Sequence, residues 1–146
     1  MYVDIHSHII PGIDDGAKDM ETALEMLRLA SLDGTRHIVA TPHFTPSSIP
    51  DHWGATLDIS GSINTSEIVR EKISELSQQA ANQNIDINIH PGTEVLIHPG
   101  IPALLESSSI CTINGSRYVL VEFPMPKYPC MLRMFSIRYS WKGWFR

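Results

Sequence analysis

Six side chains in the sequence have the chemistry to bind divalent metal ions, and each falls at or just past the carboxyl end of a segment with the pattern of a β-strand. Parallel strands gather active-site residues at that end of a sheet or barrel. Imidazole and carboxylate donors together suit Zn, Mn or Fe. We therefore predict that the six residues converge on divalent metal ions. They are His6, His8, Asp15, His43, Glu94 and Glu122.

The pair His6-x-His8 is the clearest local signal, because side chains two apart on an extended segment point the same way. Taken alone, each candidate also has an ordinary explanation. The two histidines could form a hydrogen-bonded strand end, and Asp14-Asp15-Gly16 could be a simple turn. Glu94 could be a polar turn residue and Glu122 an exposed edge residue. The metal hypothesis rests on their joint placement.

Hydrophobic periodicity places these residues on alternating strands and helices. Short β-branched or alternating segments predict strands, and apolar stripes at helical spacing predict helices, the first of them capped by Asp19. This order favours a parallel sheet with helical crossovers. The predicted strands cover residues 2–6, 36–41 and 85–89, and the predicted helices cover residues 20–32, 65–84 and 99–107.

Two further segments have distinct patterns. Residues 110–113 and 117–123 predict a β-hairpin around Asn114-Gly115, since Asn-Gly is the strongest two-residue hairpin signal. Residues 44–65 are rich in Ser, Pro, Gly and Asp and predict a long loop.

Composition excludes several other classes of protein. The chain has 146 residues and a formal net charge of -5, which fits one domain and argues against non-specific nucleic-acid binding. Its 2 cysteines cannot form a disulfide framework, so we expect a reducing, cytoplasmic setting. No apolar run reaches the roughly 18 residues of a transmembrane segment, and no signal peptide is visible.

One competing motif is Cys111-x5-Arg117, the spacing of the phosphate-binding loop in cysteine-based phosphatases. That loop must pass from a strand into a helix. Here Arg117 enters the apolar run 118–123, and Asn114-Gly115 favours a turn. We therefore interpret Cys111 as a structural strand residue.

The remaining histidines are weaker candidates for the site. His37 begins a predicted strand and is expected to be packed or solvated, and His52 lies in the long loop. His90 and His98 flank the Glu94 segment, and could support metal ligands or face a substrate.

Residues 1–17, which contain His6-x-His8 and Asp14-Asp15-Gly16, closely resemble the start of a family of bacterial tyrosine-protein phosphatases. This family is the CpsB/CapC/YwqE type of the polymerase-and-histidinol-phosphatase (PHP) superfamily. Residues 40–43, 91–94 and 119–124 continue the resemblance in the expected order. It covers roughly residues 1–124.

The resemblance implies a distorted, TIM-like (β/α)7 barrel with up to three metal ions, often manganese, at the strand ends. Carried over by position, the six candidates named above are the family's metal ligands. The implied activity is phosphoester hydrolysis, in which a metal-activated hydroxide attacks phosphorus. The implied substrate is a phosphotyrosine protein, the tail of a tyrosine autokinase of capsule or exopolysaccharide synthesis.

The chain departs from this family in length, because a full barrel needs about 250 residues. We therefore expect a partial barrel whose second half is missing. Residues 1–124 would form the N-terminal portion of a phosphatase domain, and residues 125–146 an atypical tail that a truncation or frameshift would explain. Such a half barrel exposes edges and apolar faces, which a homo-oligomer could cover.

Three alternative functions remain open at this point. The chain could be an inactive remnant that binds metal or a partner. It could be a different phosphoesterase of the superfamily, acting on histidinol phosphate or as a nuclease. Its aromatic and basic tail could also serve a membrane-surface module.

Overall fold

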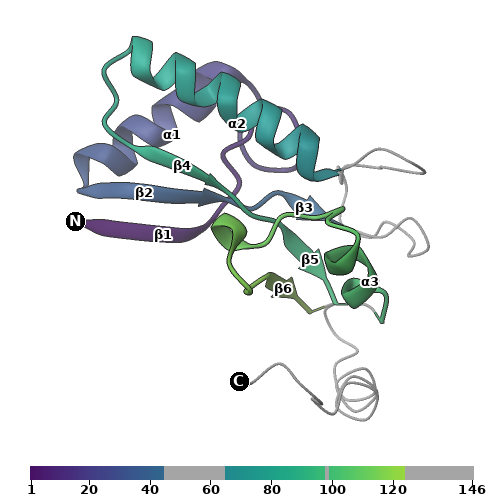
Figure 1. Cartoon of the computed structure of the whole chain (residues 1–146). Coiled ribbons are helices and arrows are strands. Elements are labelled where there is room, and N and C mark those ends of the chain that lie inside the picture. The colour runs from purple at the N-terminus through teal and green to yellow at the C-terminus, as the bar shows by residue number, and fades with distance from the viewer. Residues whose placement is uncertain (45–64, 98, 124–146) are drawn as a thin grey trace.

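Every strand pairing in the described residues is parallel, and helices connect the strands (Figure 1). The computed structural model describes residues 1–44, 65–97 and 99–123. The predicted α/β class with helical crossovers is confirmed. In chain order the elements are β1 (Tyr2–Ser7), α1 (Met20–Leu32), β2 (Thr35–Ala40), β3 (His43–Phe44), α2 (Thr65–Asn82), β4 (Asn88–Pro91), β5 (Glu94–Leu96), α3 (Ile101–Glu106), a short 3-10 helix (Ile113–Gly115) and β6 (Leu120–Glu122).

The strands form two three-stranded sheets, β1-β2-β4 and β3-β5-β6. Ala40 pairs with Pro91 and His43 pairs with Glu94, so β3 and β5 continue β2 and β4 with the same sequence offset. The ladder is interrupted at Pro42, which has no amide hydrogen to donate. The Pro42 carbonyl still accepts the Glu94 amide at 3.0 Å. The staggered strand ends therefore meet along one edge, as in a barrel wall.

Gly92 allows the two interrupted strands to run side by side. A Cβ atom at this position would lie 2.6 Å from Val39 Cγ1 and 2.9 Å from Thr41 Cγ2. Any larger residue would press against these two side chains at the end of β2 and displace the segment that joins β4 to β5. Glycine here keeps His43 and Glu94 in register.

The helices α1 and α2 lie together on one face of the β1-β2-β4 sheet (Figure 1). Asp19 caps α1 as predicted, because its carboxylate accepts the amide hydrogen of Thr22 at 2.8 Å. The apolar stripes of the two helices pack on the sheet residues that point toward them. The buried core includes Leu24, Leu27, Ile38, Ala40, Val69, Ile73, Leu76 and Ala80.

The edge strand β1 has little cover in the described part of the chain. The side chains of Tyr2, Val3 and Ile5 are each more than half exposed, although all three are large and apolar. Exposed apolar surface on an edge strand favours pairing or packing with a further element. None of the described helices combines the length and apolarity that crossing a membrane requires.

The predicted hairpin at residues 110–123 is wrong. Asn114 and Gly115 do form a tight turn with positive φ angles, and the Ile113 amide donates to the Tyr118 carbonyl at 2.8 Å. The segment before the turn is not a strand, because Ile110 and Cys111 are buried in the two cores instead. After the turn, β6 pairs in parallel with β5.

Other boundaries also differ from the sequence predictions. The strand expected at residues 85–89 begins at Asn88, because Ile85 is buried under the end of α2 rather than paired in the sheet. The short strands β3 and β5 were not predicted at all. Most of the predicted long loop (residues 45–64) and the predicted tail (residues 125–146) lie outside the described residues.

Cys111 is a buried structural residue and not a phosphatase nucleophile. It lies outside any strand, and its amide donates to Thr93 Oγ1 at 3.0 Å. Burial raises the pKa of its thiol, which disfavours the thiolate that a nucleophile needs. The Arg117 guanidinium lies over the Tyr118 ring, 5.7 Å from its centroid.

The packing of α1 on the sheet predicts a sharp contrast between two leucines. Leu27 is 0% exposed and Leu32 is 79% exposed on the same helix. Leu27→Ala should lower the free energy of unfolding by about 2–5 kcal/mol, because it leaves a core cavity. Leu32→Ala should change it by less than about 0.5 kcal/mol. Urea unfolding followed by circular dichroism measures both, and equal effects would contradict this packing.

Candidate metal centre

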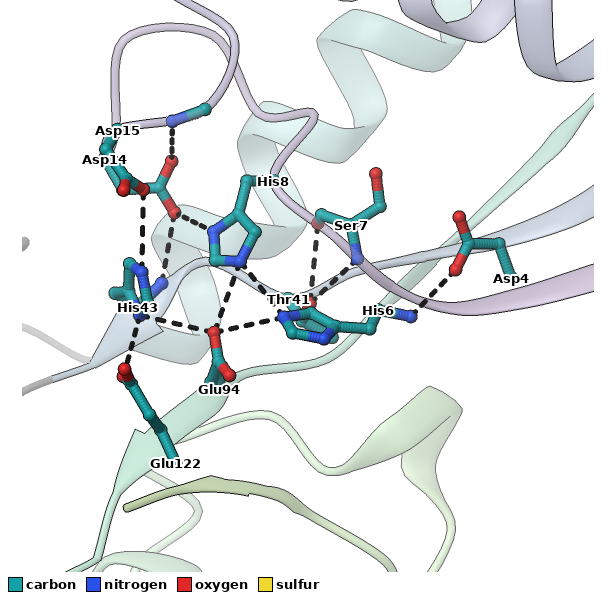
Figure 2. Close-up of polar contacts among 11 residues, drawn as sticks. Asp4, His6, Ser7, His8, Asp14, Asp15, Thr41, His43, Glu94 and Glu122 are labelled. Carbon is teal, nitrogen blue, oxygen red and sulfur yellow. Dashed lines mark hydrogen bonds and ion pairs between the residues drawn. The ribbon is translucent and has the colours of Figure 1, made fainter. Parts of the chain in front are cut away.

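The six predicted site residues come from different elements and meet at the carboxyl end of the strands (Figure 2). His6 lies in β1, and His8 follows β1 directly. Asp15 lies in the loop between β1 and α1. The other three occupy strands that run parallel to one another: His43 in β3, Glu94 in β5 and Glu122 in β6. The topology therefore brings together residues that are distant in the sequence.

The carboxylate of Glu94 is the centre of the cluster. Its Oε2 atom lies 3.1 Å from His6 Nε2, 3.2 Å from His8 Nε2 and 3.3 Å from His43 Nδ1. The Glu94 side chain is only 8% exposed. One buried oxygen thus faces three imidazoles, as Figure 2 shows.

His43 extends the cluster to the two remaining carboxylates. Its Nδ1 atom is 3.3 Å from Glu122 Oε2, and its Nε2 atom is 3.5 Å from Asp15 Oδ1. The donors form three overlapping groups in which all ligand atoms lie within 4.8 Å of one another. These groups are His6-His8-Glu94, His8-Asp15-His43 and His43-Glu94-Glu122.

The spacing of these donors fits shared metal ions. Two donor atoms that each lie about 2.1 Å from one ion are roughly 3.0–3.4 Å apart at coordination angles of about 90–109°. His6 Nε2, His8 Nε2 and Glu94 Oε2 are mutually 3.1–3.2 Å apart. The donor set of imidazole nitrogen and carboxylate oxygen suits Zn, Mn or Fe. Both the spacing and the chemistry of the cluster fit divalent ions.

The sequence alone presents Asp14 as part of a turn. In the structure it hydrogen-bonds two residues of the cluster, His8 and His43. Its Oδ2 atom accepts hydrogen bonds from His8 Nδ1 at 2.9 Å and from the His43 amide at 3.1 Å. Its Oδ1 atom accepts from the Gly16 amide at 3.0 Å. Carboxylates that bond the outer nitrogen of a histidine in this way fix its tautomer and its orientation toward metal. Asp14 therefore directs His8 Nε2 toward Glu94.

The hydrogen bond between His8 and Asp14 shifts the pKa of both residues. The bond to Asp14 raises the pKa of His8 and outweighs burial, which lowers it. Burial favours a higher pKa for Asp14, but the hydrogen bonds from His8, Gly16 and the His43 amide together hold the pKa below its ordinary value. The pair therefore keeps His8 protonated to a higher pH, and Asp14 ionised to a lower pH, than either group would be alone.

Gly16 closes the loop that carries Asp14 and Asp15. A Cβ atom at Gly16 would lie 2.0 Å from the His8 carbonyl oxygen and 2.4 Å from His8 Cβ. The Ala17 amide donates to the same carbonyl at 2.9 Å. The glycine of the Asp-Asp-Gly pattern thus allows the loop to pass directly against His8.

His90 does not join the cluster. It contacts His37 instead, at 2.9 Å between ring nitrogens. His98 lies outside the described residues. Sequence reasoning identified the six metal-ligand candidates but not the role of Asp14, whose only signal was its place beside Asp15 after His6-x-His8.

Comparison with known proteins relates the whole described chain to one family. Residues 2–134 match the family described as "Capsular polysaccharide synthesis, CpsB/CapC". The chain is 32% identical over 127 residues to tyrosine-protein phosphatase YwqE of Bacillus subtilis, covering 87% of this chain and 45% of YwqE. It is 32% identical over 123 residues to tyrosine-protein phosphatase CpsB of Streptococcus pneumoniae, covering 84% of this chain and 45% of CpsB.

A solved structure gives the same relationship in three dimensions. It comes from crystal structures of YwqE from Bacillus subtilis and CpsB from Streptococcus pneumoniae, described as unique metal-dependent tyrosine phosphatases. The match has a TM-score of 0.72 and 31% identity, over 90% of this chain and 49% of that chain. The chain thus spans about half the length of these relatives, and the predicted partial barrel is confirmed.

The contact between His8 and Asp14 predicts that Asp14 controls metal affinity. In Asp14→Asn the NH₂ group of the asparagine would replace one carboxylate oxygen and face an N–H group that now donates to Asp14. We expect metal affinity to fall by about 10–100-fold, the usual effect of losing such a support. Calorimetric titration with Mn²⁺ measures the change. The exposed Asp86, which pairs with Arg36 on the surface, offers Asp86→Asn as the matched control.

The same pair predicts how the metal-free chain responds to pH. The raised pKa of His8 stabilises the fold below its ordinary value of 6.5, and this stabilisation is lost as pH rises through the raised value. The lowered pKa of Asp14 stabilises the fold above 3.8, and this is lost as pH falls through the lowered value.

In EDTA, the difference in free energy of unfolding between the parent chain and Asp14→Asn should therefore be largest between the ordinary pKa values of 3.8 for Asp14 and 6.5 for His8. It should shrink on both sides of that window. Urea unfolding at a series of pH values tests this dependence, and a difference that does not vary with pH would contradict it.

Proposed function

The chain belongs to the CpsB/CapC family of capsular polysaccharide synthesis, and on that premise we propose that it is a metal-dependent phosphoesterase that acts on phosphotyrosine. The observation that carries this proposal is the Glu94 carboxylate, which is buried against three imidazoles. The relatives YwqE and CpsB are named tyrosine-protein phosphatases, which supports the choice of substrate class.

The chain's own residues would hold up to three ions in the three groups described above. Divalent ions, when bound, supply polarisation of the phosphoryl oxygens and lower the pKa of a water molecule. Glu94 belongs to two groups, so it links their positions, and His43 links Glu94 to Asp15 and Glu122. Asp14 keeps His8 in the orientation that faces Glu94. We favour manganese, since three carboxylates make the set rich in hard oxygen donors.

The charge of the chain supports a role for metal in attracting the substrate. The formal net charge is -5, and three of the six site residues are acids. A phosphate dianion would be repelled by these carboxylates alone. Bound cations reverse the sign of the local charge. The site therefore suits phosphate only when it is loaded with metal.

The physiological substrate we propose is a tyrosine autokinase of capsule synthesis, in the cytoplasm. The description of the family by capsular polysaccharide synthesis supports this assignment. A flexible tail of such a kinase is a suitable substrate, because a phosphotyrosine near its end can reach a site that is partly open to solvent at His6.

A second candidate function is metal or partner binding without turnover. The three donor groups support it equally, because they can hold ions whether or not phosphate is hydrolysed. Metal binding with no hydrolysis would support this second function.

Hydrolysis of p-nitrophenyl phosphate with added Mn²⁺ tests the proposal. Glu94→Gln removes the charge shared by two donor groups and should lower turnover by at least about 100-fold. Glu71→Gln, on the exposed side of α2, is the matched control and should keep full turnover. Metal-stimulated turnover that survives Glu94→Gln would refute the proposed site.

A comparison of substrates separates the phosphoesterase alternatives. Phosphotyrosine peptide, histidinol phosphate and single-stranded DNA would be offered to the same Mn²⁺-loaded chain. We expect the highest kcat/KM for the phosphotyrosine peptide. A preference for histidinol phosphate or DNA would move the chain to another branch of the superfamily.

A further inference from the structure

Two histidines outside the metal centre face each other across neighbouring strands. His37 in β2 pairs in register with Asn88 in β4, and His90 pairs with Val39, so the two histidines are diagonal neighbours. His37 Nδ1 lies 2.9 Å from His90 Nε2. Their rings are nearly parallel, with an interplanar angle of 23° and centroids 5.2 Å apart.

The pair lies on the face of the sheet that α1 and α2 do not cover. Side chains alternate between faces along a strand, and Ile38 and Ile89 point into the core under the helices. His37 and His90 therefore point the other way, and both are half-buried. Among the described residues, no group of three metal donors includes either of them. The pair is thus separate from the metal centre.

We propose that His37 and His90 form a second metal site, specific for a transition-metal ion such as Cu²⁺ or Ni²⁺. Two imidazole nitrogens from adjacent strands would be its protein ligands, and water would fill the other positions. The site has no carboxylate ligand in this arrangement, in contrast to the acidic centre around Glu94. Imidazole alone suits Cu²⁺ and Ni²⁺ better than Mn²⁺ or Mg²⁺.

The distance between the two nitrogens supports this choice of metal. Two nitrogens at about 2.05 Å from one ion and 2.9 Å apart subtend an angle of about 90°. That is the angle between neighbouring ligands in the square-planar or tetragonal coordination of Cu²⁺ and Ni²⁺. Tetrahedral Zn²⁺ would need the nitrogens about 3.3 Å apart. The observed separation of 2.9 Å matches the square geometry.

Binding needs two changes in the pair. The imidazole that donates the hydrogen bond must carry its proton on the other ring nitrogen, so that both nitrogens present lone pairs. The rings must also turn so that the two lone pairs meet at an ion beside the line that joins the nitrogens. Solvent can exchange this proton, because both rings are partly exposed, and no net proton is released. The parallel ladder of β2 and β4 already fixes the spacing of the two ligands.

Copper titration of the full chain tests the site. His6→Ala, His8→Ala, His43→Ala removes every imidazole of the main centre and breaks all three of its donor groups, and we expect this variant still to bind Cu²⁺ through two imidazoles. Its electron paramagnetic resonance spectrum should show two equatorial imidazole nitrogens. Adding His37→Gln or His90→Gln should weaken this binding at least tenfold and remove one or both nitrogen couplings. Ni²⁺ should bind the site at least as tightly as Zn²⁺.

Glutamine keeps a hydrogen-bonding group at each position, and far-UV circular dichroism checks that each variant folds. His37→Gln, His90→Gln in the otherwise unchanged chain should bind one Cu²⁺ fewer and keep its Mn²⁺ binding. Failure of the proposed phosphatase activity would leave these results unchanged. The proposal is overturned if the chain without His6, His8 and His43 binds no copper, if either glutamine variant binds it equally well, or if Zn²⁺ binds tenfold more tightly than Ni²⁺.

Discussion

The structure depends on the position of one buried carboxylate, Glu94, against three imidazoles. Buried carboxylates need a compensating positive charge, and without one their burial is strongly unfavourable. Here Glu122 and Asp15 add further negative charge around His43. Protonated histidines can supply the compensation in part, and divalent ions can supply it fully. The cluster is therefore an arrangement that cations stabilise.

The parallel pairing of the strands places the cluster residues close together in space. The register that pairs Ala40 with Pro91 continues to pair His43 with Glu94, although Pro42 interrupts the first strand. Gly92 lets the second strand pass close to the first. The fold and the site thus share one cause, because His43 and Glu94 lie just past the ends of β2 and β4, where the parallel register sets them side by side.

The sequence predicted the parts of the fold that local patterns control. The apolar stripe and the Asp19 cap identified α1, and residue type with strand-end placement identified the six candidate residues that the structure brings together. The sequence-based predictions were wrong or incomplete where contacts between distant parts of the chain determine the structure. Asn114-Gly115 forms its turn, but β6 pairs with the distant β5 rather than with its neighbour. Asp14 has the sequence pattern of a turn, and only the folded loop reveals its bond to His8.

The central claim is that the six converging side chains bind divalent ions through Glu94. The most direct measurement is anomalous diffraction at the manganese absorption edge from crystals of the chain grown with Mn²⁺. The account predicts anomalous peaks between Glu94 and the imidazoles of His6, His8 and His43, at about 2.0–2.3 Å from the donor atoms. An ordered cluster with no anomalous peak beside Glu94 would contradict it.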